Sequence, residues 1–368
     1  MSSSICQIYQ VAAFPAIRQQ PHVRSTGRLQ VGPLPCCVGK GRLHDGASSV
    51  AARSFRMGTL RQKAGGLEAL GRRPLTVCAA KEEGGETKVL VVGAGGRTGS
   101  LVLEKLLSRK DRFVTKGLVR GEKSVGKVQK GAPSAKPEDF VFADITDAAA
   151  LTKAIKEGAS GYDCMVLLTS AVPKIKYLSL IPVLLAKITG GETKRPEFAF
   201  PPGASPEEVD WLGAKNQVDA AKAAGIKRFI FVGSMGGTQI DNFLNTMGGA
   251  NILLWKRKAE HYLVASGLEY TIIHPGGLKD EEGGKRQLFV DVDDNILAGS
   301  VRSIPRADVA ELVLQCITMP QAANRSFDLA SQDEGTGTPT KDFIALIGTL
   351  EGKNCDYSLP KNSPVPLP

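Results

Sequence analysis

The sequence predicts an α/β fold in which helices cover both faces of a doubly wound parallel sheet and a small lobe follows at the C-terminal end. Between about residues 86 and 350, short continuous apolar runs alternate with helical segments, and a glycine-rich turn joins the first run to the first helix. Uninterrupted apolar strands are typical of a parallel sheet that is buried on both faces. Right-handed crossovers then give a doubly wound sheet, which binds ligands at the carboxyl ends of its strands.

Six apolar runs bounded by turn residues are expected to form the parallel strands. They cover residues 89–92, 113–119, 140–143, 164–169, 228–232 and 270–273. The helices expected between them cover residues 98–108, 147–157, 206–224 and 251–266. After residue 275 we expect short strands at 288–290 and 326–329 and helices at 307–316 and 340–350. This last part predicts a small lobe on the substrate side of the sheet, followed by a tail over residues 351–368.

The first 80 residues differ in composition from the rest of the chain. They contain nine arginines and two lysines but only Asp45 and Glu68 as acidic residues, with clusters of serine, glycine and alanine. This composition predicts that residues 1–79 are a disordered organelle transit peptide. The stretch Val77-Cys78-Ala79-Ala80 resembles a chloroplast processing site, so we expect cleavage close to Ala79 and a mature chain in the chloroplast stroma. A disordered basic tail that binds nucleic acid is the alternative.

The net charge of +10 comes almost entirely from this leader. Without it, 36 basic residues stand against 35 acidic ones, and no basic stretch is interleaved with aromatic residues, so nucleic acid is not an expected partner. Three cysteines remain, Cys164, Cys316 and Cys355, and their spacing is not that of a metal site or a redox pair. We expect packed or free thiols and no metal.

An insert of about residues 173–205 interrupts the connection after the fourth strand. Its apolar centre, residues 177–188, contains Pro182 and Lys187 and is too short to span a bilayer. We expect a surface flap or helix there. Contact with a partner, or peripheral contact with a thylakoid membrane, is left open.

The glycine turn has the composition that a bound pyrophosphate requires. It reads Gly93-Ala94-Gly95-Gly96-Arg97-Thr98-Gly99, and it follows an apolar strand and opens a helix. Glycine lets the backbone approach the phosphates, and the N-terminus of the helix attracts their negative charge. The turn therefore predicts a dinucleotide site. The residues assigned to the cofactor here are Gly93, Gly95, Gly96, Arg97, Thr98 and Gly99.

The residue after the second strand indicates which dinucleotide is bound. Enzymes that use NAD(H) carry a carboxylate there for the ribose hydroxyls, whereas this chain has Arg120. Arg120 and Arg97 can clamp the 2′-phosphate of NADP(H) between them, so NADP(H) is the expected cofactor. The alternative is that either arginine is merely solvated.

Residues after the third, fourth and sixth strands are expected to complete the cofactor site at the adenine, at the ribose and pyrophosphate, and at the nicotinamide carboxamide. In that order they are Asp144 and Ile145; Leu168, Thr169 and Ser170; and Pro275, Gly276 and Gly277. The carboxylate of Asp144 would bind the adenine amino group, although aspartate is also a common helix N-cap. The two glycines would bring backbone amides close to the carboxamide.

Several segments together give the chain a family resemblance. Besides the glycine turn, they are Val232-Gly233-Ser234-Met235-Gly236-Gly237, Asn251-Ile252-Leu253-Leu254-Trp255-Lys256-Arg257-Lys258-Ala259-Glu260, Tyr270-Thr271-Ile272-Ile273-His274-Pro275-Gly276-Gly277-Leu278 and Pro305-Arg306-Ala307-Asp308-Val309-Ala310. Over about Thr87 to Leu350 the chain resembles the atypical short-chain dehydrogenase/reductases, in particular the NmrA-like NAD(P)-binding chloroplast proteins of plants and algae. The resemblance implies a Rossmann fold and bound NADP(H).

The resemblance also implies a catalytic centre, from which this sequence departs at one position. Standard short-chain dehydrogenases use serine, tyrosine and lysine, with the tyrosine four residues before the lysine on one helix. Ser234 and Lys256 match the serine and the lysine, but Ile252 stands at the tyrosine position. The usual proton donor is therefore missing.

Helical periodicity places Lys256 on the apolar arc of its helix, whereas Arg257 and Lys258 fall outside that arc. A lysine on the buried face needs a partner, and the cofactor ribose is the expected one, so Lys256 is assigned both to the cofactor and to catalysis. The alternative is a lysine that lies along the helix edge with its charge in water.

The proton could come from another residue or from water. His274 ends the sixth strand, where it could face the nicotinamide and titrate near neutrality, or could simply be hydrogen-bonded to a loop. Ser234 is a second possible donor, and Tyr177 and Asn216 are weaker candidates.

Three functional hypotheses follow. The first is an NADPH-dependent oxidoreductase acting on a small organic carbonyl or alkene. The second is a non-catalytic protein that senses NADP(H) and regulates or scaffolds a partner, which the missing tyrosine favours. Nucleotide-sugar epimerisation ranks last, because it normally requires the same tyrosine. The substrate and the oligomeric state are left open.

Overall fold

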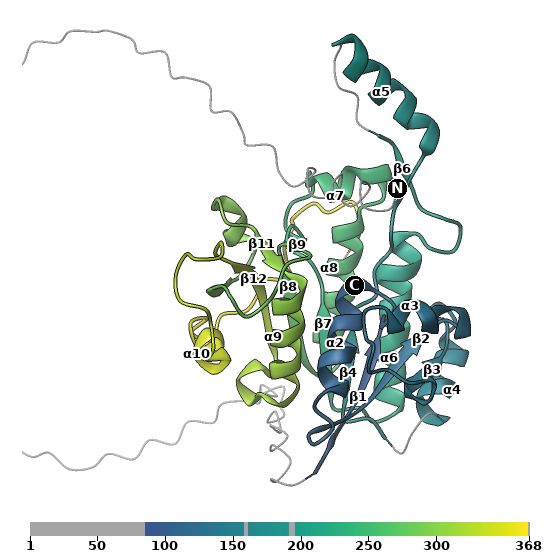
Figure 1. The fold of residues 1–368 in the computed structure, drawn as a ribbon, viewed down its shortest axis with the longest axis vertical. Coiled ribbons are helices and arrows are strands. Elements are labelled where there is room, and N and C mark those ends of the chain that lie inside the picture. Colours follow the sequence, from purple (N-terminus) through teal and green to yellow (C-terminus); the bar gives the residue numbers. More distant parts are fainter. Residues whose placement is uncertain (1–84, 158–160, 191–195, 367–368) are drawn as a thin grey trace, which may run out of the picture. The chain divides into compact units, whose positions relative to one another are not determined.

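An eight-stranded sheet forms the centre of the fold in the computed structural model, which describes residues 85–157, 161–190 and 196–366 (Figure 1). The strand order is β3-β2-β1-β4-β7-β8-β12-β10, and only the pairing of β10 with β12 is antiparallel among these strands. In chain order the strands are β1 (Thr87–Val92), β2 (Phe113–Val119), β3 (Phe140–Phe142), β4 (Cys164–Leu167), β7 (Arg228–Val232), β8 (Glu269–Pro275), β10 (Leu288–Asp291) and β12 (Arg325–Ser331). The order runs outward in both directions from β1 and β4, which is the switch point where doubly wound sheets bind ligands.

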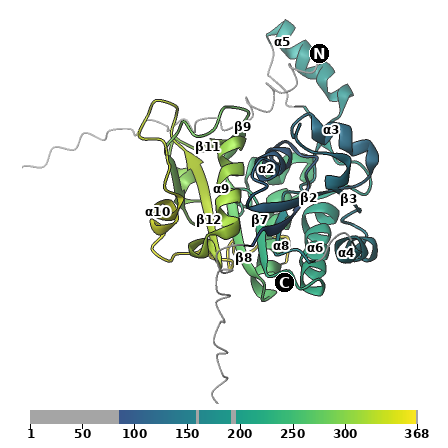
Figure 2. The ribbon, with the colours of Figure 1, turned by 60° about the horizontal axis from the view of Figure 1, so that its bottom comes forward.

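Helices cover both faces of this sheet (Figures 1 and 2). Two separate layers of apolar side chains are buried between the helices and the sheet. The layer on one face includes α2 (Arg97–Leu107), α3 (Val125–Gln129), α9 (Arg306–Thr318) and α10 (Phe343–Gly348). The layer on the other face includes α4 (Ala148–Glu157), α6 (Ala214–Ala223) and α8 (Ile252–Ala265). Successive residues of β1 alternate between the two layers, as expected for a strand that is buried on both sides. The predicted Rossmann fold is confirmed.

Smaller elements surround the sheet. Two short pairs of strands are β5 (Lys174–Ile175) with β6 (Phe198–Ala199), which are antiparallel, and β9 (Gly277–Lys279) with β11 (Ser303–Pro305), which are parallel. The remaining helices are α5 (Leu180–Thr189), α7 (Phe243–Thr246) and the short turns η1 (Glu122–Ser124), η2 (Pro137–Asp139), η3 (Tyr177–Ser179), η5 (Met247–Gly249), η6 (Asn295–Ala298) and η7 (Pro320–Ala322). The C-terminal part shares the main sheet through β10 and β12 and adds the small β9–β11 sheet beside it.

Most predicted elements occur within a few residues of their expected bounds, and β2 and β7 match them at both ends. The predicted helix 206–224 is different, because it divides into a π-helical segment, η4 (Glu207–Gly213), and the α-helix α6. Gly213 ends the π-helical segment, and a Cβ atom at this position would lie 2.9 Å from the Cδ1 atom of Ile145. The absence of a side chain thus lets this segment pack closely on the end of the third strand.

The insert and the tail differ in how far their apolar side chains are exposed. Helix α5 exposes Ile181, Leu184, Leu185 and Ile188, whereas the tail buries Cys355 and Val365 against the domain. Within the described part of the chain, no helix combines the length and the apolar character needed to cross a membrane. The predicted transit peptide, residues 1–79, lies outside the described residues.

Candidate functional site

The glycine turn has the geometry of a phosphate cradle. Gly93 has a left-handed φ of 85°, and a Cβ atom there would lie 2.8 Å from the carbonyl carbon of Leu168. A Cβ atom at Gly99 would lie only 2.1 Å from the carbonyl oxygen of Gly93, so the turn can close only around glycine. Helix α2 follows at Arg97, and its N-cap residue, Gly96, has no side chain to cap the first N–H groups. These donors at the switch point fit the pyrophosphate of a dinucleotide.

Arg97 and Arg120 lie at the two positions expected of the clamp, and each interacts with a different carboxylate. The guanidinium of Arg97 is half-exposed and lies 2.7 Å from Asp280, whose other oxygen pairs with Arg306 at 2.6 Å. Arg120 is exposed just beyond β2, and its charge helps to lower the pKa of Asp144. The ion pair of Arg97 shows that this side chain can also reach toward the loop after β9.

Asp144 closes the turn that follows β3. Its carboxylate accepts hydrogen bonds from the backbone N–H and the hydroxyl of Thr146 at 2.9 and 2.8 Å, and the cap of helix α4 is formed by Asp147 instead. Partial burial raises the pKa of Asp144, but these bonds and the charge of Arg120 outweigh it and hold the pKa below its ordinary value. Ile145 is buried beside it and packs on Gly213.

The segment after β4 lies against the glycine turn and helix α6. The side-chain amide of Gln217 donates to the hydroxyl of Thr169 at 3.2 Å and to the carbonyl of Gly213 at 3.0 Å. The carbonyl oxygen of this fully buried Gln217 has no hydrogen-bond partner among the described residues. Ser170 is exposed, and Leu168 packs against Gly93.

The backbone N–H groups of Gly276 and Gly277, which are expected to lie close to the nicotinamide carboxamide, form hydrogen bonds within the protein. The N–H of Gly276 donates to the carbonyl of Leu329 at 3.0 Å, and the N–H of Gly277 donates to the carbonyl of Arg302 at 2.8 Å. Both amides therefore have acceptors within the protein, because the chain after Pro275 enters β9 and pairs with the β11 region. These two hydrogen bonds hold the loop after Pro275 in place.

Lys256 is buried, as its helical position predicts, but its partner belongs to the protein. Its Nζ atom lies 2.6 Å from the Oδ1 atom of Asp210, and both side chains are almost completely excluded from solvent. The other carboxylate oxygen of Asp210 accepts from the backbone N–H of Ala171 at 3.2 Å. Burial raises the pKa of Asp210, and the ion pair with Lys256 offsets this only in part. Lys256 thus has a partner within the protein besides the cofactor ribose that its buried position led us to expect.

Sequence reasoning missed Asp210, although a signal was present. Asp210 precedes Ala214 and Gln217 by four and seven residues, and all three are buried. Helical periodicity could thus have placed this carboxylate on the buried face of its segment. The π-helical geometry of η4, which is frequent at functional sites, is not visible in the sequence.

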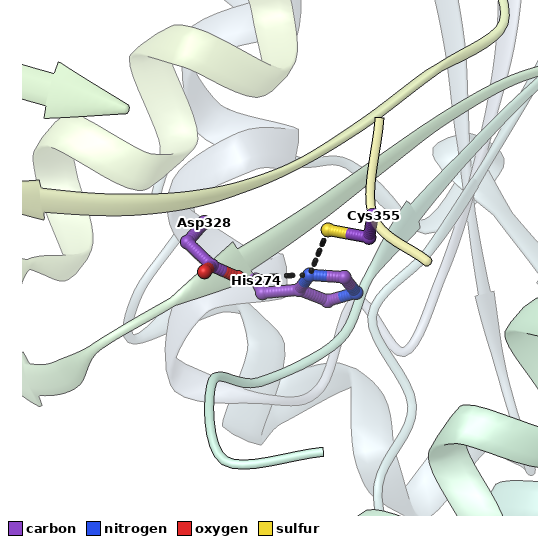
Figure 3. Close-up of side chains that lie close together, drawn as sticks. All are labelled: His274, Asp328 and Cys355. Atoms are coloured by element: carbon purple, nitrogen blue, oxygen red, sulfur yellow. Dashed lines mark hydrogen bonds and ion pairs between the residues drawn. The ribbon is translucent and has the colours of Figure 1, made fainter. Parts of the chain in front are cut away.

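The imidazole of His274, on β8, lies between the carboxylates of Glu260 on α8 and Asp328 on β12. Its Nε2 atom lies 3.0 Å from Glu260. Its Nδ1 atom lies 3.2 Å from Asp328 and 3.6 Å from the thiol of Cys355 (Figure 3). Burial lowers the pKa of His274, but Glu260, Cys355 and Asp328 raise it well above its ordinary value. The expectation that His274 titrates near neutrality is therefore wrong, because the carboxylates favour the imidazolium.

Arg257 was expected outside the buried arc of its helix and is instead buried. Its guanidinium stacks on the ring of Tyr357, with 4.1 Å between the guanidinium carbon and the ring centroid. It also donates to the carbonyl oxygen of Asp356 at 2.6 Å. The expectation failed because the C-terminal tail covers this face of α8, which a helical projection of α8 alone does not show.

The site residues thus fall into neighbouring groups. Ser234 and His274 line one pocket, together with Thr238, Leu253 and Cys355. The hydroxyl of Ser234 donates to the carbonyl of Met235 at 3.1 Å. Ile252 occupies the tyrosine position on α8, so the serine and the lysine are present without the usual donor between them.

Comparison with known proteins gives the class to which this fold and site belong. Residues 93–320 match the model of the NAD(P)H-binding family. The match runs from the glycine turn through α9. The chain belongs to this family, as an atypical short-chain dehydrogenase/reductase of the chloroplast type. The bound cofactor of the family is a nicotinamide dinucleotide, and the cradle at residues 93–99 fits its pyrophosphate.

Two plant proteins resemble the chain over most of their length. An uncharacterised chloroplast protein of Arabidopsis thaliana is 50% identical over 266 residues, which cover 72% of this chain and 76% of that protein. Sanguinarine reductase of Eschscholzia californica is 44% identical over 272 residues, which cover 71% of this chain and 95% of that protein. The likeness to a chloroplast protein supports a chloroplast location, and the likeness to a reductase supports an oxidoreductase.

A solved structure supports the fold alone. The putative NAD-dependent epimerase/dehydratase from Bacillus halodurans superposes with a TM-score of 0.51 at 24% identity. The superposition covers 72% of this chain and the whole of that protein.

Proposed function

We propose that the protein is an NADPH-dependent reductase of the chloroplast stroma that acts on a carbonyl or alkene group of a small organic molecule. The observation that carries this proposal is the glycine cradle at the switch point, with Arg120 beyond β2 where an NAD(H) enzyme needs a carboxylate. The similarity to sanguinarine reductase over 95% of that protein supports a reductase rather than an epimerase.

The residues of the chain have distinct parts in this proposal. The glycine turn binds the pyrophosphate through the backbone and the start of α2, and Arg120 binds the 2′-phosphate, with Arg97 free to leave Asp280 and join it. Lys256, positioned by Asp210, binds the nicotinamide ribose. The bound dinucleotide supplies a hydride. Ser234 takes the place of the missing tyrosine. Its hydroxyl donates a proton to the substrate oxygen or carbon that gains negative charge, and water then reprotonates the serine.

The cofactor assignment is tested by Arg120→Glu. Removing the phosphate contact and adding a negative charge should weaken NADPH binding by about 10–100-fold, the equivalent of a lost charge-assisted hydrogen bond, while NADH binding changes little. The measurement is the dissociation constant of each cofactor by fluorescence titration. Arg112→Glu, just before β2, is the matched control, since it makes the same charge change outside the proposed phosphate site. Equal affinities of the wild-type protein for NADPH and NADH would refute the assignment.

The reaction is tested by stopped-flow absorbance of NADPH against quinones, aldehydes and enones. We expect oxidation by at least one acceptor class, and Ser234→Ala should lower kcat by about 10²–10⁴-fold with NADPH affinity retained, as for loss of a positioned proton donor. A protein that binds NADPH but transfers no hydride to any acceptor would refute the reductase.

That result would favour the second function, a non-catalytic sensor of NADP(H). The ion pair between Lys256 and Asp210 supports this alternative, because it satisfies the lysine without a ribose. The stromal location is tested separately by fusing residues 1–79 to a fluorescent reporter, and cytosolic retention of the fusion would contradict it.

A further inference from the structure

A second cluster of reactive side chains lies beside the proposed reductase site. Three potential metal-binding atoms, Nδ1 of His274, a carboxylate oxygen of Asp328 and Sγ of Cys355, lie within 4.8 Å of one another (Figure 3). All three residues are buried, and they come from β8, β12 and the C-terminal tail. A histidine, a carboxylate and a thiol together are a donor set that suits zinc.

Two of the three distances between these atoms agree with the edges of a zinc tetrahedron. With bonds of about 2.1 Å to nitrogen and oxygen and about 2.3 Å to sulfur, the N···O edge is roughly 3.4 Å and the N···S edge roughly 3.6 Å. The observed separations are 3.2 Å from His274 to Asp328 and 3.6 Å from His274 to Cys355. The third edge, from Asp328 to Cys355, is at most 4.8 Å. It can shorten by a small movement of the tail, where Asn354 and Asp356 on either side of Cys355 are exposed.

The atoms around the cluster already orient the ligands. Glu260 accepts at the opposite nitrogen of His274, Nε2, at 3.0 Å, which is the usual outer partner of a metal-binding histidine. The second oxygen of Asp328 accepts from the backbone N–H of Asp294 at 2.7 Å. One atom of each of these two ligands is therefore held from outside, and the other faces the centre of the cluster.

The charge around the cluster also favours a cation. The lining of this pocket carries four carboxylates, those of Glu260, Asp293, Asp294 and Asp328, against the guanidinium of Arg257 and the imidazole of His274, which these carboxylates favour in its protonated form. Such a buried excess of carboxylates needs cationic partners.

We propose that His274, Asp328 and Cys355 bind one Zn²⁺ ion, with water in the fourth position, and that this ion fastens the C-terminal tail to the neighbouring strands β8 and β12. Binding displaces the proton between His274 and Asp328 and the proton of the Cys355 thiol, and both protons pass to solvent. The ion would connect segments that lie 54 and 81 residues apart in the sequence. The competing structure is a metal-free cluster in which a protonated His274 bridges the two carboxylates.

Cobalt titration of the full chain distinguishes the two structures. After treatment with EDTA, the protein should bind one Co²⁺ per chain and develop a thiolate-to-cobalt charge-transfer band, which one equivalent of Zn²⁺ should abolish. Cys355→Ser should lose this band. Cys316→Ser is the matched control, because Cys316 is an equally buried free thiol on α9 and lies outside the cluster. Glu260→Gln should keep the band but weaken metal binding by about 10–100-fold, as expected for an outer partner.

A second measurement needs no variant. In the wild-type protein, Zn²⁺ should slow the alkylation of Cys355 by a thiol reagent at least tenfold and leave Cys316 unchanged, as measured by mass spectrometry of the two peptides. A wild-type protein without the charge-transfer band would overturn the proposal, as would a band that survives in Cys355→Ser, or Zn²⁺ protection equal at both cysteines. NADPH affinity, measured on the same samples, separates this result from a failure of the reductase proposal.

Discussion

Lys256 and Asp210 show how a buried charge depends on one particular partner. The two side chains lie 2.6 Å apart with almost no exposure, so each compensates the cost of burying the other. The pair joins α8 to η4, and through the N–H of Ala171 it also joins the segment after β4. It therefore supports the proposed ribose position as well as the fold.

Lys256→Met should destabilise the protein strongly, because Asp210 would be left buried without its cation. The expected loss is about 3–5 kcal/mol in the free energy of unfolding, measured by urea denaturation. The double variant Lys256→Met/Asp210→Leu should recover most of this loss, since an apolar pair leaves no uncompensated charge. A single variant that loses less than about 1 kcal/mol would contradict the coupling.

At the scale of whole elements, ion pairs join helix α9 to the C-terminal end of helix α2. Glu311 on α9 lies 2.7 Å from Lys105 on α2 and 3.2 Å from Arg109 just beyond it. Burial raises the pKa of Glu311, but Lys105, Gln315 and Arg109 outweigh it and hold the pKa below its ordinary value. The glycine turn leads into α2, and this contact holds the opposite, C-terminal end of that helix against α9.

Glu311→Gln should therefore lower stability in a pH-dependent way. A carboxylate whose pKa is lowered by folding stabilises the protein above its unfolded pKa of about 4.5, and this contribution is lost as the pH falls through the folded pKa. At pH 7 the variant should lose about 1 kcal/mol, and the difference from wild type should shrink below pH 4.5. Urea denaturation at several pH values measures this. Glu138→Gln is the control. It removes an exposed ion pair, in which Glu138 lies 3.9 Å from Lys136, and should have little effect. A Glu311→Gln deficit that grows as the pH falls would have the wrong sign for this account.

At the scale of the whole molecule, the C-terminal tail packs against the domain and covers Arg257 on α8. Its backbone accepts from Arg257 at Asp356 and Leu359, the ring of Tyr357 stacks on the same guanidinium, and Val365 is buried. The sequence predicts only a tail after residue 350, since the segment has no periodic pattern. Its place is decided by the buried side chains that it covers.

Deleting residues 353–368 should destabilise the domain. Exposure of Val365 and of the surface under Tyr357 costs roughly 1.5–3 kcal/mol for each buried side chain, and Arg257 also loses its acceptors. The melting temperature, measured by circular dichroism, should fall. A chain that lacks only residues 366–368 is the control and should melt like the wild type. If the two truncated chains melt alike, the tail contributes no stability.

The sequence by itself determined the features that depend on neighbours along the chain. These are the apolar runs that become the strands, the glycine turn at residues 93–99, Arg120 after the second strand and the missing tyrosine at Ile252. Each of them follows from local periodicity or from the conformational freedom of one residue, so a one-dimensional pattern is enough to find it.

Only the tertiary structure decided which groups the buried charged side chains contact. Lys256 pairs with a carboxylate 46 residues away, Arg257 with a carbonyl 99 residues away, and His274 with a thiol 81 residues away. A buried charge takes whichever partner the folded chain brings within reach, because its desolvation must be compensated there. Such partners are set by how the strands and the tail come together in space, which no spacing in the sequence records.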